Sequence, residues 1–223
     1  NTYGTLNLAQ RAARAGANRF VFLSSIGVLG DWTRQPLTPW DLPTPTDPYA
    51  LSKLEAEEGL HRLALETGME VVIIRPPLVY GPGAPGNFKR LASAVAKGLP
   101  LPLKGIDNRR SLVALPNLLD LVSVCLSHPE AANRTFLVSD GEDVSTPELV
   151  RRMAGAMGKR ARLIPVSPKT LYTFGHVLGR AKTVKSLCES LQVDMEETRR
   201  TLGWNPTVSL DEGLRQAVAD HTR

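Results

Sequence analysis

Cysteines, aromatic residues and long apolar runs are all scarce in this chain, and each shortage argues against a class of protein. Only two cysteines occur among 223 residues, and Cys125 and Cys188 are too widely separated for a disulfide framework or a metal site. No stretch approaches the roughly 20 apolar residues of a membrane-spanning helix, and no segment resembles a signal peptide. We therefore expect no metal site, no membrane partner and a cytoplasmic location.

Acidic residues are also fewer than basic ones. The 27 Lys and Arg residues exceed the 22 Asp and Glu residues, which gives a net charge of +5. The basic residues are dispersed and only 5% of the chain is aromatic, whereas a nucleic-acid-binding surface gathers cations and interleaves them with aromatic rings. We expect no nucleic-acid partner, and we expect several cations to bind an anionic small molecule such as a diphosphate.

Helical and strand patterns alternate along the chain, and 42% hydrophobic content is enough to form a sizeable core. Strands are expected at 19–23, 70–75, 111–115 and 135–138, and helices up to 15, at 49–66 and 87–97, and from 116 and 145, with a further strand and shorter helices after 162. This order predicts an α/β fold with a doubly wound, Rossmann-like parallel sheet. Residues 1–82 would form the carboxyl half of a dinucleotide-binding domain. Residues 83–223 would form mainly a smaller α/β substrate lobe, with some segments returning to the main sheet.

The start of the chain already has the pattern of a helix in progress. Leu6, Ala9, Ala12 and Ala13 follow helical spacing, and no glycine-rich dinucleotide-binding turn is present in the sequence. We expect an amino-terminal part to be missing, so the sheet would be incomplete at that end. A chain beginning at Asn1 is expected to bind a dinucleotide poorly or not at all.

Tyr49 and Lys53 are the most informative residues in the sequence. They lie four residues apart in an expected helix, which puts the phenol and the ammonium on one face. A cation within about 4 to 6 Å of a phenol favours the phenolate, so such a tyrosine can exchange a proton with an alcohol. Taken alone, the spacing arises often by chance and is more often an ordinary pair on a helix surface.

A serine pair at the end of a strand supports the chemical interpretation. Ser24 and Ser25 follow the apolar strand at 19–23, and functional residues of doubly wound folds gather at the carboxyl ends of strands. A hydroxyl at Ser25 can hydrogen-bond the substrate oxygen that Tyr49 handles. A serine pair in this position also fits a simple turn.

Four motifs in order resemble the extended short-chain dehydrogenase/reductase superfamily, and more narrowly the NAD-dependent epimerase/dehydratase family. The resemblance covers almost the whole chain. The motifs are Asn-x-x-Gly-Thr-x-Asn at 1–7, Arg-Phe-Val-Phe-Leu-Ser-Ser at 19–25, Pro-Tyr-x-x-Ser-Lys at 48–53, and Ile-Arg-Pro-Pro-Leu-Val-Tyr-Gly-Pro-Gly at 74–83. A Leu-Gly-Trp-x-Pro segment at 202–206 also fits the family.

The resemblance implies a role for each matching residue. The catalytic residues would be Ser25, Tyr49 and Lys53. The cofactor, NAD or NADP, would be bound by Ser24, Tyr49, Lys53 and the backbone at Pro76. The substrate would be bound by Ser25, Asn87 and Arg110, the last two meeting its diphosphate. Asn87 also fits a helix cap, and Arg110 also fits a solvated loop.

The family further implies oxidation or reduction at C4 of a UDP-sugar, as a 4-epimerase or a 4-ketoreductase. Some segments are similar to a bacterial surface-polysaccharide branch that acts on UDP-N-acetylamino sugars. The usual Arg-Asp-Tyr at the phosphate site is Arg-Ser-Leu at 110–112 here, so recognition of uridine is less secure than the redox chemistry. The alternatives are a reductase of hydrophobic ketones or alcohols, and a non-catalytic fragment. A homodimer through the helices near 15 and 49–66 is expected from relatives.

Overall fold

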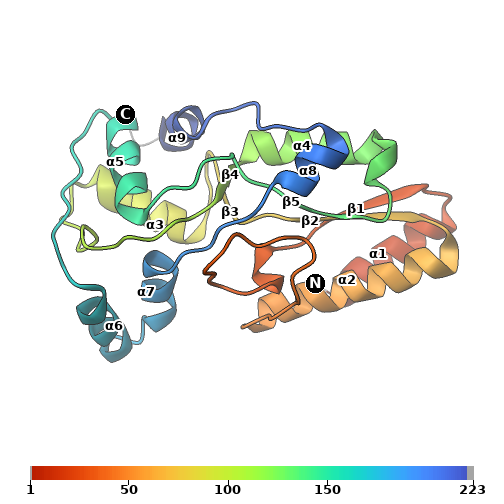
Figure 1. Cartoon of the computed structure of the whole chain (residues 1–223), viewed down its shortest axis with the longest axis horizontal. Helices are drawn as coiled ribbons and strands as arrows, with labels where there is room; N and C mark the ends of the chain where they lie inside the picture. Colours follow the sequence, from red (N-terminus) through yellow and green to blue (C-terminus); the bar gives the residue numbers. More distant parts are fainter. Residues whose placement is uncertain (1, 220–223) are drawn as a thin grey trace.

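The computed structural model describes residues 2–219 and forms two parallel sheets surrounded by helices (Figure 1). Asn1, the first residue of the first motif, lies outside the described residues. One sheet has the order β1-β2-β5 and the other pairs β3 with β4. The strands are β1 (Arg19–Leu23), β2 (Glu70–Arg75), β3 (Leu78–Tyr80), β4 (Leu112–Ala114) and β5 (Thr135–Leu137). The α-helices are α1 (Thr2–Arg14), α2 (Pro48–Thr67), α3 (Gly86–Ala96), α4 (Leu115–Ser127), α5 (Thr146–Ala156), α6 (Pro168–Val177), α7 (Ala181–Cys188), α8 (Glu196–Leu202) and α9 (Leu210–Val218). Two short 3-10 helices are η1 (Ile26–Val28) and η2 (Pro129–Ala131).

Strand β2 forms the centre of the first sheet and is buried on both faces. Val71 and Ile73 pack into the core formed with α1 and α2, whereas Val72 and Ile74 pack into the core formed with α4 and α8. Side chains alternate between the two faces of a strand, so a run of four apolar residues satisfies both layers. Figure 1 shows α1 and α2 on one side of the sheet and α4 and α8 on the other. The predicted doubly wound α/β fold is confirmed.

The longest helix, α2, begins and ends at residues whose types favour those positions. Asp47 is its N-cap and accepts a hydrogen bond from the backbone N–H of Ala50 at 2.8 Å, while Pro48 occupies the first turn. Gly68 ends the helix with a φ of 74°, a left-handed conformation that favours glycine. Because Tyr49 directly follows Pro48, this cap places the tyrosine in the first turn of α2.

The second sheet supports a separate core made by α3, α5 and α9. Tyr80 and Leu112 lie at its centre together with Phe88 of α3, Val150 of α5 and Leu214 of α9. Strand β5 comes from the second half of the chain but pairs in parallel with β2 of the first sheet. The two halves of the chain are therefore joined through the sheet as well as through the backbone.

Two details of the second half differ from the pattern-based expectation. A strand was expected after residue 162, but Leu163 makes only an isolated bridge to Leu101, because the prolines at 165 and 168 leave too short a run to extend the pairing. The short strand β3 was not expected, because Pro76-Pro77 was read as the end of extended structure. Instead the prolines separate β2 from β3, and β3 pairs with β4 in a different sheet.

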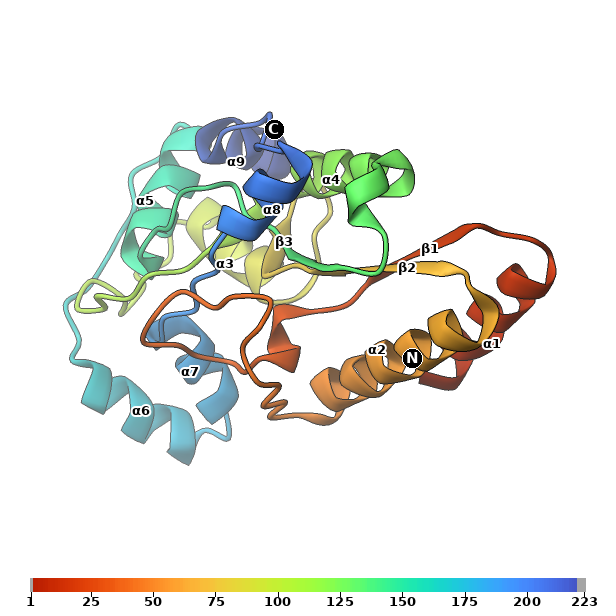
Figure 2. The ribbon, with the colours of Figure 1, turned by 45° about the vertical axis from the view of Figure 1, so that its right-hand side comes forward.

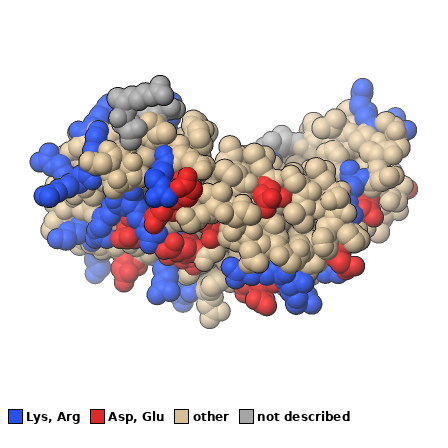
Figure 3. Space-filling model, turned by 90° about the horizontal axis from the view of Figure 1, so that it is seen from above, with Lys and Arg blue, Asp and Glu red and all other residues tan. Residues whose placement is uncertain are grey.

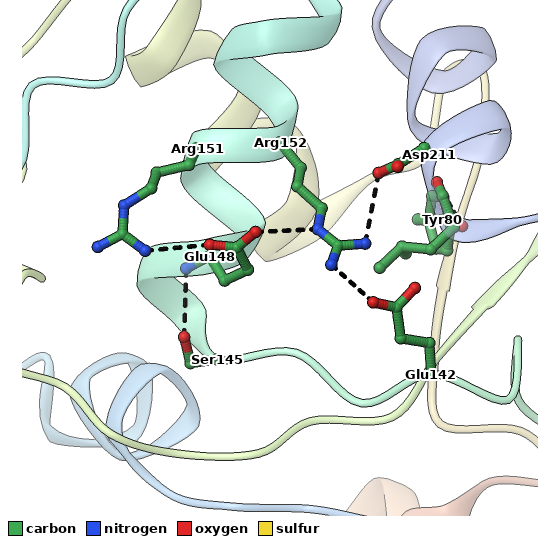
Figure 4. Close-up of polar contacts among 8 residues, drawn as sticks. Tyr80, Glu142, Ser145, Glu148, Arg151, Arg152 and Asp211 are labelled. Carbon is green, nitrogen blue, oxygen red and sulfur yellow. Dashed lines mark hydrogen bonds and ion pairs between the residues drawn. The ribbon is translucent and has the colours of Figure 1, made fainter.

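Charged residues are mixed in sign on the face that carries α5 and α9. Figure 3 shows Lys and Arg most numerous at one end of this face with Asp and Glu among them, a largely uncharged middle, and further residues of both signs along the edge and at the other end. Arg152 of α5 contacts Glu142 at 2.6 Å, Glu148 at 3.1 Å and Asp211 at 3.4 Å (Figure 4). This cluster ties α5 to α9 and to the loop after β5. As expected, Ser145 caps α5 by accepting from the N–H of Glu148.

A buried carboxylate connects the two sheets to α4. Asp140 accepts hydrogen bonds from the Tyr80 hydroxyl at 2.6 Å, the Ala114 backbone N–H at 2.8 Å and the Asn117 side-chain amide at 2.7 Å. Burial raises the pKa of both Asp140 and Tyr80. Each donor is buried, so the carboxylate satisfies groups that water cannot reach.

Asp140→Ala should therefore cost much more stability than Tyr80→Phe. The alanine removes an acceptor from three buried donors: the Ala114 N–H loses its carboxylate partner, the Tyr80 hydroxyl keeps only a long contact of 3.4 Å to the Leu210 carbonyl, and the Asn117 amide keeps the Val208 carbonyl. We expect the free energy of unfolding to fall by about 3 kcal/mol. The phenylalanine removes one donor from a carboxylate that retains two, and we expect a loss of about 1 kcal/mol. Urea denaturation followed by circular dichroism measures both, and equal losses would contradict this account.

Candidate active site

Tyr49 and Lys53 both project from the first turns of α2 beside the carboxyl end of β1. Tyr49 is 54% exposed, so its large aromatic side chain is accessible at the surface. The Lys53 ammonium lies 5.9 Å from the centroid of the Tyr49 ring and 4.6 Å from that of Phe22. The predicted helical spacing thus places the phenol and the ammonium on one face, as the chemical interpretation requires.

Lys53 is anchored to the end of the strand. Its ammonium donates a hydrogen bond to the backbone carbonyl of Leu23 at 2.7 Å. Burial lowers the pKa of Lys53, and the nearby carboxylate of Glu57 opposes that shift. The ammonium is therefore held at a defined place next to the tyrosine, and it does not extend into bulk water.

Ser25 lies between the strand end and the first turn of α2. Its hydroxyl caps η1 by accepting from the Gly27 backbone N–H at 3.1 Å. Gly27 allows this close packing, because a Cβ there would lie 3.3 Å from the Ser25 hydroxyl oxygen and 3.5 Å from the Cβ of Ala50. Ser25 is half-buried and lies close to the residue that follows Tyr49. Both motifs thus reach the same corner of the fold.

Beneath this corner is a buried polar contact among Ser24, Glu57 and Arg75. The Ser24 hydroxyl donates to the carboxylate of Glu57. Arg75 donates to both oxygens of that carboxylate, from Nε at 3.0 Å and from Nη2 at 2.6 Å. Glu57 is 2% exposed and Arg75 is 7% exposed. The contact joins the ends of β1 and β2 to the helix that carries Tyr49 and Lys53.

This contact changes how the expected role of Ser24 is understood. Ser24 was expected to line the cofactor pocket, but it is 5% exposed and its hydroxyl points into the core toward Glu57. Its hydroxyl therefore links the end of β1 to Glu57 of α2, and its expected contact with the cofactor stays a prediction. Pro76 is also buried, and its carbonyl accepts from the Ile26 N–H at 2.9 Å, which ties the end of β2 to η1.

A cleft of about 560 Å³ opens beside the cap of α2. Its wall is formed by segments distant in sequence: Asp31, Asp47, Asn87, Tyr172, Lys182 and Lys185 are among the lining residues. Lys185 of α7 pairs with Asp31 of the loop after η1 at 3.1 Å, so the loop and α7 lie side by side (Figure 2). The cleft therefore begins at Thr46 and Asp47, just before Tyr49 in the sequence, and runs toward α3 and α7.

Asn87 and Arg110, the expected diphosphate ligands, share the wall of a cavity of about 70 Å³. Asn87 also lines the larger cleft, is exposed, and donates to the Ser186 hydroxyl at 3.2 Å. It lies inside α3 and does not cap it, since Pro85 holds the cap position. Arg110 donates to the carbonyl of Glu189 at 3.1 Å, and among residues 2–219 no carboxylate pairs with it. Burial lowers the pKa of Arg110, but an arginine stays charged.

Several functional residues were missed by the sequence interpretation. Glu57 lies one helical turn after Lys53, and Arg75 is the charged residue that directly follows the four apolar residues at the centre of β2. A buried strand rarely ends in an unpaired arginine, so this residue was a usable signal. By contrast, Lys182 and Lys185 reach the cleft only because α7 folds back over α3, and no local pattern indicates that.

Two findings bear on partners and ligands. No helix in the described part of the chain is long and apolar enough to cross a membrane. Within residues 2–219 there is also no group of three or more His, Cys, Asp or Glu side chains arranged to hold a metal ion. Cys125 is buried, and burial raises its pKa to about 12, while Cys188 is half-buried on α7.

The doubly wound sheet, with a tyrosine and a lysine at its strand ends, defines an α/β protein of the dinucleotide-binding class. Comparison with known proteins narrows this class. The model of the NAD dependent epimerase/dehydratase family matches residues 1–139. The chain is 49% identical over 221 residues to UDP-glucose 4-epimerase of Vibrio cholerae, covering 98% of this chain and 67% of that protein. This chain belongs to the NAD-dependent epimerase/dehydratase family.

Further relatives and solved structures match over nearly the whole of this chain. UDP-glucose 4-epimerase of Mycolicibacterium smegmatis is 30% identical, with 98% of this chain and 67% of that protein covered. The structure of RMD from Pseudomonas aeruginosa with NADPH superposes with a TM-score of 0.80 at 23% identity, covering 100% of this chain and 73% of that one. UDP-glucose 4-epimerase of Thermotoga maritima with UDP-glucose gives 0.77 at 22%, covering 98% and 68%. The chain thus spans about two thirds of the length of the two epimerases matched by sequence.

The buried contact beneath the site gives a direct prediction. Glu57→Gln should lower the free energy of unfolding by about 3 kcal/mol, because Arg75 then becomes a buried cation without a counter-charge. The matched control is Glu58→Gln, since Glu58 is the next residue of the same helix and is exposed. We expect that control to change stability by less than about 0.5 kcal/mol in urea denaturation. Equal effects of the two changes would refute the assignment of Glu57 to the core.

Proposed function

We propose that this chain is the catalytic and substrate-binding part of an NAD(P)-dependent enzyme that acts at C4 of a UDP-sugar. The observation that carries the proposal is the meeting of Tyr49 and Lys53 directly after the N-cap residue Asp47, which itself lines a cleft shared with Asn87. The 49% identity to a UDP-glucose 4-epimerase supports the same chemistry. A 4-epimerase is the leading activity, and a 4-ketoreductase uses the same residues.

The residues present fit the nicotinamide end of the cofactor. Tyr49 and Leu23 are large side chains left 54% and 40% exposed at the end of β1, where a flat ring could cover them. Lys53 is placed to bind the ribose hydroxyls, and the backbone at Pro76 would face the ring. When bound, the cofactor accepts a hydride from the sugar carbon or returns one. The glycine-rich turn for the pyrophosphate is not in this sequence, so these residues hold one end of the cofactor only.

Tyr49 acts on the proton of the C4 hydroxyl. Its phenolate oxygen removes that proton as the hydride leaves, and the phenol returns it when the keto group is reduced. Lys53 stabilises the phenolate, because its ammonium is fixed on the same helix face by the carbonyl of Leu23. Ser25 donates a hydrogen bond to the C4 oxygen and so orients the sugar.

Asn87 and Arg110 bind the diphosphate. Arg110 offers a planar fork of donors suited to two phosphate oxygens, and no carboxylate in the described residues competes for it. Beyond Asn87 lies an apolar cavity of about 280 Å³ that includes Leu91, Leu103 and Leu187, with room for a flat base. A hydrophobic ketone would need neither cation nor amide, so this arrangement favours a sugar diphosphate over that alternative.

One incubation distinguishes the epimerase from the ketoreductase. The protein, extended at its amino end to include a glycine-rich turn, is given a panel of UDP-sugars with NAD or NADP in oxidised and reduced forms. An inverted C4 centre without net cofactor turnover selects the epimerase, whereas stoichiometric loss of reduced cofactor selects the reductase. Turnover of hydrophobic ketones alone would overturn the sugar assignment.

Three further expectations remain predictions. The division at residue 82 into a cofactor half and a substrate lobe is one, and β5 would be among the segments returning to the main sheet. A homodimer through α1 and α2 is the second, supported by the exposed Tyr3, Leu8 and Leu65 on those helices. A cytoplasmic location is the third.

Tyr49→Phe should abolish most turnover without harming the fold. We expect kcat to fall by about 100-fold to 10,000-fold, because the variant has no acid or base at the C4 oxygen. The side chain is half exposed, so thermal unfolding should be unchanged. The control is that the extended protein carrying this change still binds the cofactor. Normal turnover of the UDP-sugar by the variant would contradict the mechanism.

Arg110→Ala should affect binding of the substrate more than the chemical step. Losing a charge-assisted fork should raise KM for the UDP-sugar by about 10-fold to 100-fold with a smaller change in kcat. Arg109→Ala is the matched control, because Arg109 is the adjacent residue and is exposed. Equal KM values for the two variants would remove Arg110 from the diphosphate site.

A further inference from the structure

The helical hairpin formed by α6 and α7, here called the α6–α7 hairpin (residues 168–188), carries an apolar surface that the proposed chemistry does not use. Phe174, Val177 and Leu178 are 61%, 78% and 68% exposed. They are spaced three and four residues apart, so they share one face at the end of α6. Large apolar side chains grouped on one exposed face are typical of a surface that contacts something else.

The hairpin is packed mainly against itself. Gly175 is the single buried residue of α6, where it contacts Val184 of α7, and α7 has no buried residue. The hairpin's contacts to the rest of the molecule are few: Leu171, Leu187 and Cys188 pack against the core around Tyr80 and Phe88, and polar contacts include Asn87 with Ser186 and Lys185 with Asp31. Figures 1 and 2 show α6 as the outermost helix on its side of the molecule. The apolar face of α6 is therefore presented outward.

Basic residues predominate in the sequence segment that carries this apolar face. No Asp or Glu occurs between Glu148 and Glu189, whereas nine Lys and Arg residues do, at positions 151, 152, 159, 160, 162, 169, 180, 182 and 185. Within residues 168–188 of the structure, only Lys185 pairs with a carboxylate. The charge next to the exposed face is thus strongly one-signed.

A cationic cleft adjoins the apolar residues. It has a volume of about 570 Å³, and Arg90, His176, Arg180 and Lys182 are among its lining residues, with no carboxylate. His176 and Arg180 flank Val177 and Leu178 in sequence. A site for an anionic group therefore lies directly beside side chains able to enter an apolar layer.

We propose that the α6–α7 hairpin docks on an anionic phospholipid surface. Phe174, Val177 and Leu178 enter the boundary between headgroups and acyl chains, and Arg180 and Lys182 meet lipid phosphates. An exposed apolar face edged with Lys and Arg is what an interfacial helix presents to a bilayer. The charge decides the partner, since a second copy of this hairpin would bring like charges together. Docking of this kind needs no membrane-spanning helix.

The apolar contribution is tested by vesicle sedimentation with the full chain. Phosphatidylcholine vesicles with about one third phosphatidylglycerol should bind the protein, and pure phosphatidylcholine should bind it much less. Phe174→Ser with Leu178→Ser should weaken binding by more than about tenfold. Leu119→Ser with Leu126→Ser is the matched control, since these leucines of α4 are similarly exposed, at 54% and 57%. Equal weakening by both pairs overturns the proposal.

The charged contribution is tested in the same assay. Arg180→Ser with Lys182→Ser should weaken binding by about fivefold per charge, whereas Arg14→Ser with Arg62→Ser, on α1 and α2, should have little effect. Binding should also fall as salt rises. Absence of binding to anionic vesicles overturns the proposal. A second result would also overturn the proposal. If sedimentation velocity shows that Phe174→Ser with Leu178→Ser dissociates an oligomer, and vesicles bind neither the unchanged protein nor this variant, the face is a contact between copies of the chain.

Discussion

The ion pair between Glu57 and Arg75 determines where Tyr49 and Lys53 lie. It is almost fully buried, so breaking it would leave a charge in the core, and this cost holds the end of β2 against the middle of α2. Ser24 adds the end of β1 to the same carboxylate. Lys53 lies one turn earlier on the helix and binds the adjacent carbonyl of Leu23. The position of the ammonium beside the phenol thus follows from a contact that no substrate touches.

The groove past this corner is assembled from segments that are remote in sequence. The cap of α2, the start of α3 and the middle of α7 each contribute one wall. Weak polar contacts, including Asn87 with Ser186, hold these walls together. Under the proposed function, a substrate with phosphates would bridge elements that have few contacts of their own, in a groove lined by Lys182 and Lys185 as well as Asp31 and Asp47.

Much of the fold could be predicted from the sequence, because its strands are short apolar runs between clear breaks. Arg19–Leu23 and Glu70–Arg75 form strands at the expected residues, and Gly68 ends the helix between them. The placement of Tyr49 and Lys53 followed from helical spacing alone. The direction of the Ser24 hydroxyl could not be predicted, because it depends on the partner that packs behind it. The isolated bridge at Leu163 in place of a strand could have been anticipated, because Pro165 and Pro168 follow it closely.

The loose attachment of the α6–α7 hairpin has an evolutionary consequence. Because its two helices contact mainly one another, exposed positions on its outward face can change without disturbing the buried cores, whereas Leu171, Leu187 and Cys188 pack against one core and are constrained. Lineages sharing the same tyrosine and lysine could therefore exchange or reshape this segment and acquire new recognition properties while the reacting groups stay in place. The buried cores limit which substitutions are tolerated, whereas the outward face of the α6–α7 hairpin tolerates more, so one fold can acquire different recognition surfaces.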